Sequence, residues 1–575
     1  MIETDKKGCR ELLMQRMALA IITSVTLQLL LVCCLVLFTN LSMDYGRWFE
    51  ETWTTITSPW MWAYFIILII VTILQGFVCS KNYLHPPPYY KSRFVKLYKT
   101  LTFQSLLLRA LYVIIGGIIV WLHLSLKKGN YSSLTTDSNI TYGIYLQEDY
   151  YFLLFSGLWS GLYFLVKTEN ATKKYLQFPI IAQSKFFQLR RKLYTMFPTL
   201  IISSMWSTLY YVIIYYFLRL YCHEALLSLL SVQVEVKSLN FVIKLLNLSL
   251  ILQLWLHQFI FILIISNTYT LFEICLTEWA PFKFGLSGAY NPDSSEMTLI
   301  DVLSMDKIPI MQHLGYLDLI TLAQKEKIRR STLFTLSTPG GHPYNWNCVV
   351  EKCTNLLKKF SSDLNMISAK SQDHSVSYST LTARVPPVQH TKYMYHMRKL
   401  IPDVPSTSVV EADTSEAPYS GSFMQKFLKQ KKEAVTAYLF SKPLISYIFA
   451  EQDENKIRYV LHNGQLVIWA AEAISSLAVF SLNEDSYGIV QKDVPIIINA
   501  LLSVKQALDK LQKSTVSARK KLADDKLIRE IFTSLRSAIK GSLYAIVTNF
   551  ELYINDLSLE PTTVEQLQGF LNYKE

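Results

Sequence analysis

Six apolar runs, each close to the length needed to cross a bilayer, dominate the first half of this 575-residue chain. A membrane-spanning helix needs about 20 predominantly apolar residues. The runs cover residues 18–38, 60–79, 106–126, 149–166, 197–220 and 248–272. We therefore predict a six-helix transmembrane domain over residues 17–272, preceded by a short cytosolic tail at 1–16.

The second half has apolar positions at helical rather than strand spacing. Between residues 497 and 511, apolar side chains recur every three or four positions, which is typical of an amphipathic helix. Residues 368–421 differ, because Ser, Thr, Pro and Gly fill 20 of their 54 positions, as in a flexible linker. The predicted fold is all-α, with a helical segment at 273–367, the linker, and a helical C-terminal domain at 422–575.

Basic residues are concentrated in two of the loops between the apolar runs. The loop after the second run carries five, Lys81, Lys91, Arg93, Lys96 and Lys99, with no acidic residue. The loop after the fourth run carries seven against one acidic residue. Cytosolic loops of membrane proteins are enriched in Lys and Arg. With six spans, this pattern places both basic loops, both termini and the C-terminal domain on the cytosolic side.

The predicted lumenal loops are short and leave no room for a lumenal domain. The loop after the third run contains two glycosylation sequons, at Asn130 and Asn139. A third sequon, at Asn170, falls on the predicted cytosolic side. Only the first two are therefore candidate glycosylation sites.

The net charge of +12 lies almost entirely in the apolar half. Residues 1–272 hold 23 Lys and Arg against 12 Asp and Glu, which leaves a net charge near zero for the rest. A nucleic-acid-binding protein would place this excess on a soluble module. The pattern instead favours contact with anionic lipid, and the candidate lipid-facing residues are Lys185, Arg190, Arg191, Lys192, Lys426 and Lys429.

Two of those lysines, Lys426 and Lys429, belong to an amphipathic segment at 423–439 that has two interpretations. It either lies on a membrane surface or packs on its own domain with its lysines in water. In the membrane half, Gly157 and Gly161 form a G-x-x-x-G pattern, which allows two helix backbones to approach closely. These glycines are candidates for helix packing, although the pattern is also common by chance.

Sequence motifs of catalysis and cofactor binding do not occur in the chain. It contains no phosphate-binding glycine loop, no dinucleotide fingerprint, no zinc-protease motif and no nucleophile elbow. Cys348, Cys353 and His342 lie close together in the sequence but lack a second ligand pair, so we predict neither a metal nor a cofactor.

Two groups within the apolar runs, His257 and Cys79, keep two alternatives to a structural role open, a transporter or channel and an enzyme. His257, inside the sixth run, would serve a transporter or channel, or simply hydrogen-bond between helices. Cys79, at the end of the second run, is a candidate nucleophile for a membrane-embedded transferase. Arg109 lies near the cytosolic end of the third run, where its side chain can reach the headgroups.

Four segments, in order along the chain, resemble one family. The first is Phe-Pro-Ile-Ile at 178–181, followed by Lys185 and by Arg190-Arg191. The second is a Pro-Gly-Gly-His-Pro turn, made of Pro339, Gly340, Gly341, His342 and Pro343, with Trp346 after it. The third surrounds Trp469, and the fourth is the C-terminal stretch 570–575. Together they resemble the nuclear division cycle transmembrane nucleoporins of animals, the membrane anchors of the nuclear pore complex.

The resemblance implies six spans, termini on the cytosolic side, and a helical C-terminal region that meets the pore scaffold. It also implies partners, namely the propeller nucleoporin Aladin and the inner-ring or membrane nucleoporins, besides the lipids of the nuclear envelope. The turn at 339–343, Trp346 and Trp469 are candidates for partner binding or for fixing the turn to its own domain. The linker at 368–421 is shorter than is usual in the family.

Overall fold

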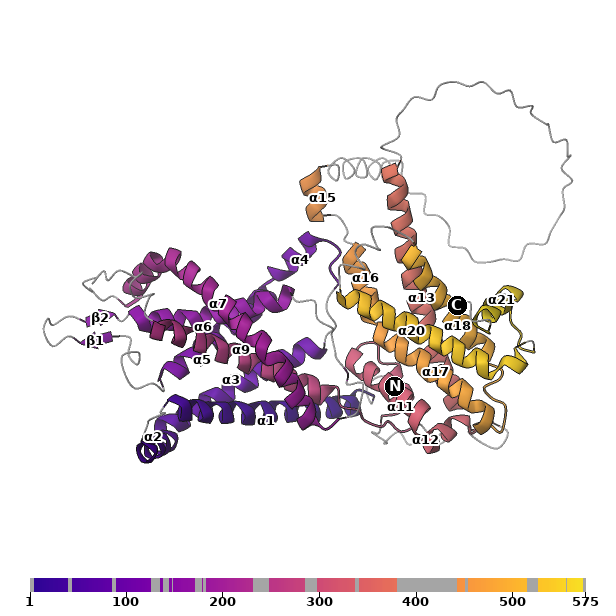
Figure 1. Cartoon of the computed structure of the whole chain (residues 1–575), viewed down its shortest axis with the longest axis horizontal. Helices are drawn as coiled ribbons and strands as arrows, with labels where there is room; N and C mark the ends of the chain where they lie inside the picture. Colours follow the sequence, from indigo (N-terminus) through magenta and orange to yellow (C-terminus); the bar gives the residue numbers. More distant parts are fainter. Residues whose placement is uncertain are drawn as a thin grey trace, which may run out of the picture.

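The computed structural model describes most of the chain and leaves several connecting segments out. The described residues are 5–39, 44–84, 89–125, 135–137, 144–146, 148–170, 178, 183–230, 248–284, 297–336, 341–379, 442–449, 453–513, 526–554 and 556–571. They form two bodies, a bundle of long apolar helices and a helical C-terminal domain (Figure 1). The expected all-α class is confirmed, apart from one short hairpin.

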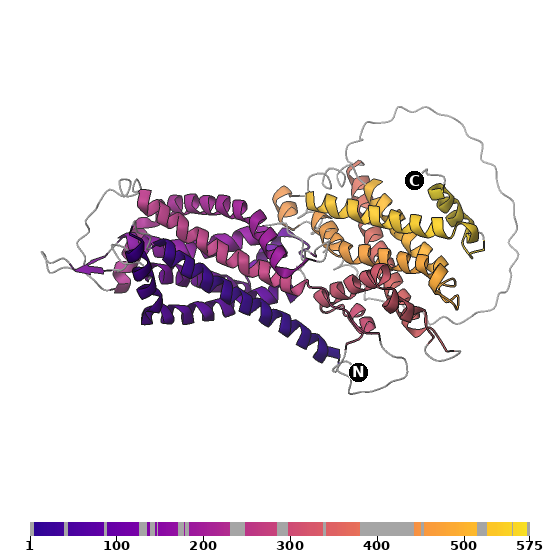
Figure 2. The same ribbon diagram turned by 60° about the horizontal axis from the view of Figure 1, so that its bottom comes forward.

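Six long helices cross the bundle. They are α1 (Asp5–Thr39), α3 (Pro59–Leu84), α5 (Phe103–Ser125), α6 (Glu148–Asn170), α7 (Lys185–Leu230) and α9 (Leu248–Leu276). Figure 2 shows them side by side along the length of the bundle. Each contains one of the six predicted spans, apart from residue 126 of the third, which lies outside the described residues. α7 is the longest and continues through Pro198 without a break.

Within the described residues, helix length and hydropathy alone select a slightly different set of six candidate spans. Five coincide with α1, α3, α5, α7 and α9, but the sixth, Asn455–Glu484, lies in the C-terminal domain, and α6 is not among them. Packing resolves the difference. The apolar window within 455–484 is 67% buried, in a domain where α17 (Gly464–Glu484) contacts α11 (Pro309–Lys325), α13 (Tyr344–Ser379) and α20 (Lys526–Asn549). α6 instead packs along α5 and α9 in the bundle.

The end of the bundle away from the C-terminal domain carries two small elements. One is the amphipathic helix α2 (Tyr45–Thr57), capped by the side chain of Asp44. The other is an antiparallel hairpin of β1 (Thr135–Asp137) and β2 (Ile144–Leu146), which the sequence analysis did not predict. Figure 1 shows both at the far end from the domain.

The C-terminal domain begins directly after α9. Its elements are α10 (Leu299–Leu303), α11 (Pro309–Lys325), α12 (Lys327–Ser331), η1 (Thr332–Phe334), α13 (Tyr344–Ser379), α15 (Pro443–Phe449), α16 (Asp453–His462), α17 (Gly464–Glu484), α18 (Val494–Lys513), α20 (Lys526–Asn549), η2 (Glu551–Tyr553) and α21 (Pro561–Leu571). Elements from both sides of the predicted linker share one apolar core, since α13 packs on α17 and α18. α13 also runs to Ser379, so residues 368–379 are helical rather than the start of a linker.

The two bodies meet at the end of the bundle where α1 begins and α9 ends (Figure 1). A short helix, α4 (Arg93–Thr100), lies at this junction, between the bundle and α15. The buried cluster of the C-terminal domain extends into the bundle and includes Cys9 and Leu13 of α1 and Phe272 of α9. The first turns of α1, ahead of the predicted first span, are therefore part of the core of the C-terminal domain.

Candidate membrane and scaffold interface

Two of the candidate lipid-facing lysines form ion pairs with acidic residues in the last turn of α9 and just after it. Lys185 Nζ lies 2.9 Å from Glu278 Oε2, and Lys192 Nζ lies 2.9 Å from Glu273 Oε2. The second pair is the more sheltered, with side chains 26% and 18% exposed. These lysines therefore join α7 to the end of α9 at the junction, and each has a carboxylate of the same chain beside it.

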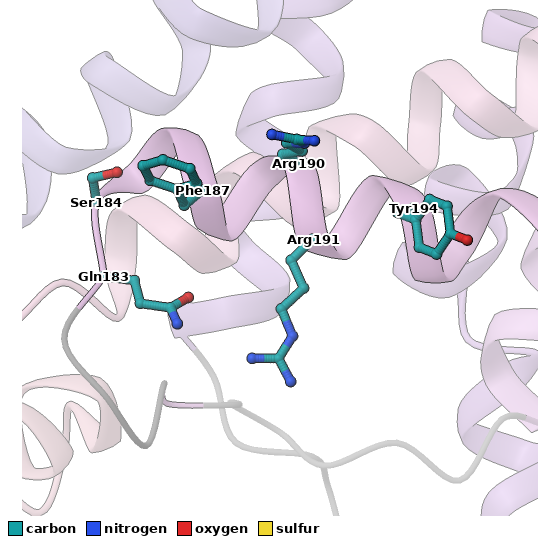
Figure 3. A pocket seen from close by; sticks show the side chains of 6 residues that line it. All are labelled: Gln183, Ser184, Phe187, Arg190, Arg191 and Tyr194. Atoms are coloured by element: carbon teal, nitrogen blue, oxygen red, sulfur yellow. The ribbon is translucent and has the colours of Figure 1, made fainter.

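The two arginines between them face a cavity instead. Gln183, Ser184, Phe187, Arg190, Arg191 and Tyr194 line this open cavity at the start of α7 (Figure 3). Arg190 and Arg191 are exposed, and Phe187 and Tyr194 are 58% and 83% exposed. Guanidinium groups bind phosphate with paired hydrogen bonds, and aromatic rings favour the membrane–water boundary. This combination suits an anionic lipid headgroup.

The glycines of the G-x-x-x-G pattern lie at the crossing of α5 and α6. A Cβ atom on Gly157 would come within 2.7 Å of the carbonyl oxygen of Gly116, and one on Gly161 within 2.5 Å of that of Tyr112. Both contacts are to backbone atoms, which no side-chain rotation can relieve. The helices approach this closely because all three glycines lack side chains.

Trp346, three residues after Pro343, is buried inside the C-terminal domain. Its ring is fully buried, its Nε1 donates a hydrogen bond to Asp493 Oδ2 at 2.8 Å, and it packs on Phe334. Of the turn itself, the structure describes Gly341, which is half-buried, the exposed His342, and the half-buried Pro343. Trp346 thus fixes the beginning of α13 to the start of α18.

Trp469 contacts a residue from the loop that connects two membrane spans. The ring of Phe178, between α6 and α7, meets Trp469 edge-on with centroids 5.0 Å apart and stacks on His313 of α11. His313 is buried, and its Nδ1 lies 2.7 Å from the carbonyl oxygen of Pro309. Burial lowers the pKa of His313 to about 4, so the imidazole is neutral at physiological pH.

Two buried ion pairs in the C-terminal domain were not anticipated from the sequence. The carboxylate of Asp318 is fully buried and accepts hydrogen bonds from Arg329, from Trp279 Nε1 and from the backbone nitrogen of Phe282. Trp279 and Phe282 follow the last span directly, so Asp318 fixes the exit of the chain from the bundle. The only sequence signal was a lone Asp inside an apolar helical stripe.

The second pair is bidentate. Arg330 donates to both carboxylate oxygens of Glu484, at 2.8 and 2.7 Å, and to the carbonyl oxygen of Ala323. Its guanidinium also lies 3.9 Å from the centre of the Phe480 ring. The hydrogen bonds from Arg330 lower the pKa of Glu484. This pair joins α12 to the end of α17.

The residues behind the two alternative functions have local partners. His257 Nδ1 lies 2.7 Å from the carbonyl oxygen of Gln253, one turn earlier, and its ring meets that of His123 at 6.2 Å. Cys79 is fully buried, while Arg109 is half-buried near the start of α5. Among the described residues, no group of three metal-ligating side chains is found.

Several candidate residues lie outside the described part of the chain. They are Asn130, Asn139, Pro339, Gly340, Lys426 and Lys429. The amphipathic segment at 423–439 also lies there, as does the predicted linker from residue 380 onward. Their roles remain predictions.

Comparison with known proteins covers the bundle and the C-terminal domain together. Residues 11–568 match the family described as nucleoporin protein Ndc1-Nup. The chain is 26% identical to human nucleoporin NDC1 over 659 aligned residues, covering 97% of each protein. It is 25% identical to Drosophila melanogaster nucleoporin Ndc1 over 590, covering 99% of each. With Xenopus laevis nucleoporin NDC1 the identity is also 25%, over 95% of this chain and 96% of the frog protein.

Proposed function

Because the chain belongs to the Ndc1 family of nucleoporins, membrane-spanning components of the nuclear pore, we propose that its bundle and its C-terminal domain act as one anchor. The bundle holds the pore membrane, and the helical domain holds the soluble scaffold. Force on the scaffold then reaches the membrane through the chain that leaves α9 and through the contacts between the two bodies. Those contacts therefore carry the proposal.

Residues from two loops of the bundle contact the C-terminal domain, and we call this set of contacts the clasp. Its members are Phe178 with Trp469 and His313, Tyr90 with Asn455, and Tyr89 with Tyr459. Phe178 packs on Trp469 and His313, as described above. Asn455 of α16 donates to the carbonyl oxygen of Tyr90 at 3.4 Å, and the rings of Tyr89 and Tyr459 meet with their centroids 5.2 Å apart. The clasp thus uses both basic loops.

The basic end of the bundle faces the cytosol or pore in this proposal. The clasp lies at that end, and the hairpin and α2 lie at the other, which becomes lumenal. Both termini are then on the cytosolic side, as the positive-inside rule predicts. Each Lys or Arg near an anionic leaflet adds about 1 kcal/mol of attraction.

Arg190 and Arg191 supply the lipid contact at the junction. Unlike Lys185 and Lys192, they line an open cavity with two aromatic residues. We assign the cavity to a phosphate of the cytosolic leaflet. Glutamine at both positions would keep the cavity but remove its charge.

The partners implied by the family resemblance are Aladin and the inner-ring or membrane nucleoporins, bound through the C-terminal domain. Trp346 and Trp469 support this binding indirectly, since they are buried and hold the domain together. The proposed role requires no catalytic step, no cofactor and no direct contact with nucleic acid.

The test replaces the endogenous protein with the chain tagged at its C-terminus, imaged beside a scaffold nucleoporin. The parent chain should form rim puncta that coincide with pores. A clasp variant, Phe178→Ala with Trp469→Ala, should still enter the envelope but recruit less scaffold. Phe186→Ala is the matched control, since Phe186 is in the same region and 69% exposed.

Two results would contradict the proposal. An even reticular signal for the parent chain would exclude a pore anchor and favour the transporter hypothesis built on His257. Full scaffold recruitment by a clasp variant that is folded would show that the two bodies act independently.

A further inference from the structure

Helix α4 has one apolar face and one basic face, although it is only eight residues long. Phe94, Leu97, Tyr98 and Leu101, the residue that caps its end, recur at the spacing of one helix face. Arg93, Lys96 and Lys99 lie on the opposite face. This division of side chains is the pattern of a helix that lies at a membrane surface.

The apolar face is open to the surroundings. The four side chains are 43%, 56%, 64% and 57% exposed, in chain order, and no residue of α4 is buried. A soluble protein would gain by covering such a stripe, because apolar area exposed to water is unfavourable by about 25 cal/mol per Å². An apolar face that stays open on a membrane protein instead suits contact with lipid.

The place of α4 in the chain fixes where its apolar face lies. Only Leu101 and Thr102 separate it from α5, which crosses the membrane. The stripe continues into α5 at Phe103 and Leu107, which are 79% and 61% exposed. At the other end, the side chain of Ser92 caps α4 by accepting a hydrogen bond from Val95. The helix is therefore held at the boundary between the bundle and the cytosolic side.

The C-terminal domain reaches α4 through α15 and covers only one flank of it. The guanidinium of Arg93 lies 3.6 Å from the centre of the Tyr447 ring, and Phe94 stacks on Phe449 at 4.7 Å. Tyr447 and Phe449 are themselves 65% and 44% exposed. Tyr98 and Leu101, further along the helix, remain the most open part of the stripe.

We propose that α4 is an interfacial helix whose Phe94–Leu97–Tyr98–Leu101 face inserts into the cytosolic leaflet, while Lys96 and Lys99 hold anionic headgroups. The lipid is favoured over a protein occupant by two observations. The basic face complements anionic phosphate, and the apolar stripe is continuous with a membrane-spanning helix. Since α15 packs on α4, the C-terminal domain is then linked to the membrane through α4 as well as through the chain that leaves α9. The inference rests on the orientation proposed above.

The experiment uses the full chain in vesicles of phosphatidylcholine and phosphatidylserine. Photoreactive p-benzoylphenylalanine replaces Tyr98, Leu101 or Lys96, one at a time, and mass spectrometry identifies the adducts after irradiation. Tyr98 and Leu101 should give acyl-chain adducts several-fold more often than Lys96, the matched exposed control on the other face. Circular dichroism and the thermal midpoint establish that each labelled protein is folded.

A second arm tests the charge. With the label at Tyr98, phosphatidylserine should be over-represented among the adducts relative to its share of the vesicle. Lys96→Gln with Lys99→Gln should return that share to the bulk value without reducing total lipid adducts.

Three outcomes would overturn the inference. Equal lipid adducts at Lys96 and Tyr98 would show that α4 has no lipid-facing side. Adducts to protein at Tyr98 and Leu101 would show that a partner or second copy covers the stripe. A phosphatidylserine share equal to the bulk in the parent chain would remove the role of the lysines. None of these readouts depends on pore localisation, so failure here is separable from failure of the proposed anchor.

Discussion

The ring of Phe178 stacks on the imidazole of His313, with centroids 5.8 Å apart and planes inclined by 4°. Phe178 comes from the loop between two membrane spans, and His313 is buried in α11 of the C-terminal domain. A single aromatic contact thus places a titratable group at the point where the two bodies meet.

Acidification should weaken this contact. Burial lowers the pKa of His313 from 6.5 to about 4 in the folded protein, so the unfolded chain binds the proton more readily between these values. Above pH 6.5, His313 is neutral in both states and does not reduce the free energy of unfolding. As the pH falls from 6.5 toward 4, that free energy decreases, by at most about 3 kcal/mol. His462, whose pKa burial also lowers to about 4, adds in the same direction.

His313→Phe should reduce this pH dependence. The thermal midpoint of the purified protein, measured between pH 7 and pH 5, should fall less steeply in the variant than in the parent. His342→Phe, at an exposed position, is the control and should leave the slope unchanged. Identical slopes for His313→Phe and the parent would remove His313 from the explanation.

Arg330→Met should destabilise the C-terminal domain strongly. It leaves Glu484 without its partner in a site where the two side chains are 5% and 12% exposed. Removing one member of a buried pair costs about 3–5 kcal/mol. Arg536→Met is the matched control, because Arg536 and Asp509 are 36% and 29% exposed and such pairs contribute less than about 1 kcal/mol.

A double variant separates charge burial from packing. Arg330→Met combined with Glu484→Leu should recover part of the lost thermal stability, since no uncompensated charge remains. If the double variant instead lost as much stability as Arg330→Met and Glu484→Leu together, Glu484 would stabilise the domain through other contacts.

Gly161→Ala and Gly157→Ala should each loosen the crossing of α5 and α6. The added Cβ would lie 2.5 or 2.7 Å from a backbone oxygen, so the helices must separate. Overpacking of this kind costs about 1–3 kcal/mol, and the thermal midpoint in detergent should fall. At Gly541 an added Cβ would have no atom within 4 Å, so Gly541→Ala should leave the thermal midpoint unchanged or raise it slightly. Equal effects at all three positions would point to helix propensity rather than packing.

The sequons test the orientation. Asn130 and Asn139 should carry glycans, and Asn170 should not, because α6 brings Asn170 back to the end of the bundle that holds the clasp. Endoglycosidase should increase the gel mobility of the parent chain but not of the Asn130→Gln, Asn139→Gln double variant. A glycan on Asn170 would contradict the proposed orientation and place the clasp on the lumenal side.

The positions of the spans were predictable from the sequence, because a bilayer requires apolar runs of a certain length. Their alternating direction could be predicted from the Lys and Arg content of the loops, which is likewise a local feature. The fourth span was predicted from an 18-residue run, and α6 does pack inside the bundle. The apolar helix α17 is the opposite case. Composition alone cannot distinguish a helix buried in a domain core from one buried in lipid, and only its contacts with α11 and α20 do so.

The clasp could not be predicted, because its members lie far apart in the sequence. Phe178 and Trp469 were noticed only as parts of a family resemblance, with no sign that they touch. Asp318 and Arg329 are eleven residues apart and pair across a helix end, which no helical spacing rule covers. Lys185 and Lys192 were expected to face lipid, and only the fold shows Glu278 and Glu273 beside them.

The contact between the first and last spans has a consequence for biosynthesis. Arg16 of α1 donates a hydrogen bond to the carbonyl oxygen of Leu276, 260 residues later, and Cys9 and Leu13 belong to the core of the C-terminal domain. During synthesis, α1 is therefore made long before these partners, and its first turns lack them until then. A chain halted before α11 would expose these turns to chaperones and proteases. The first turns of α1 are thus fully covered only after roughly the last 300 residues have been made and folded.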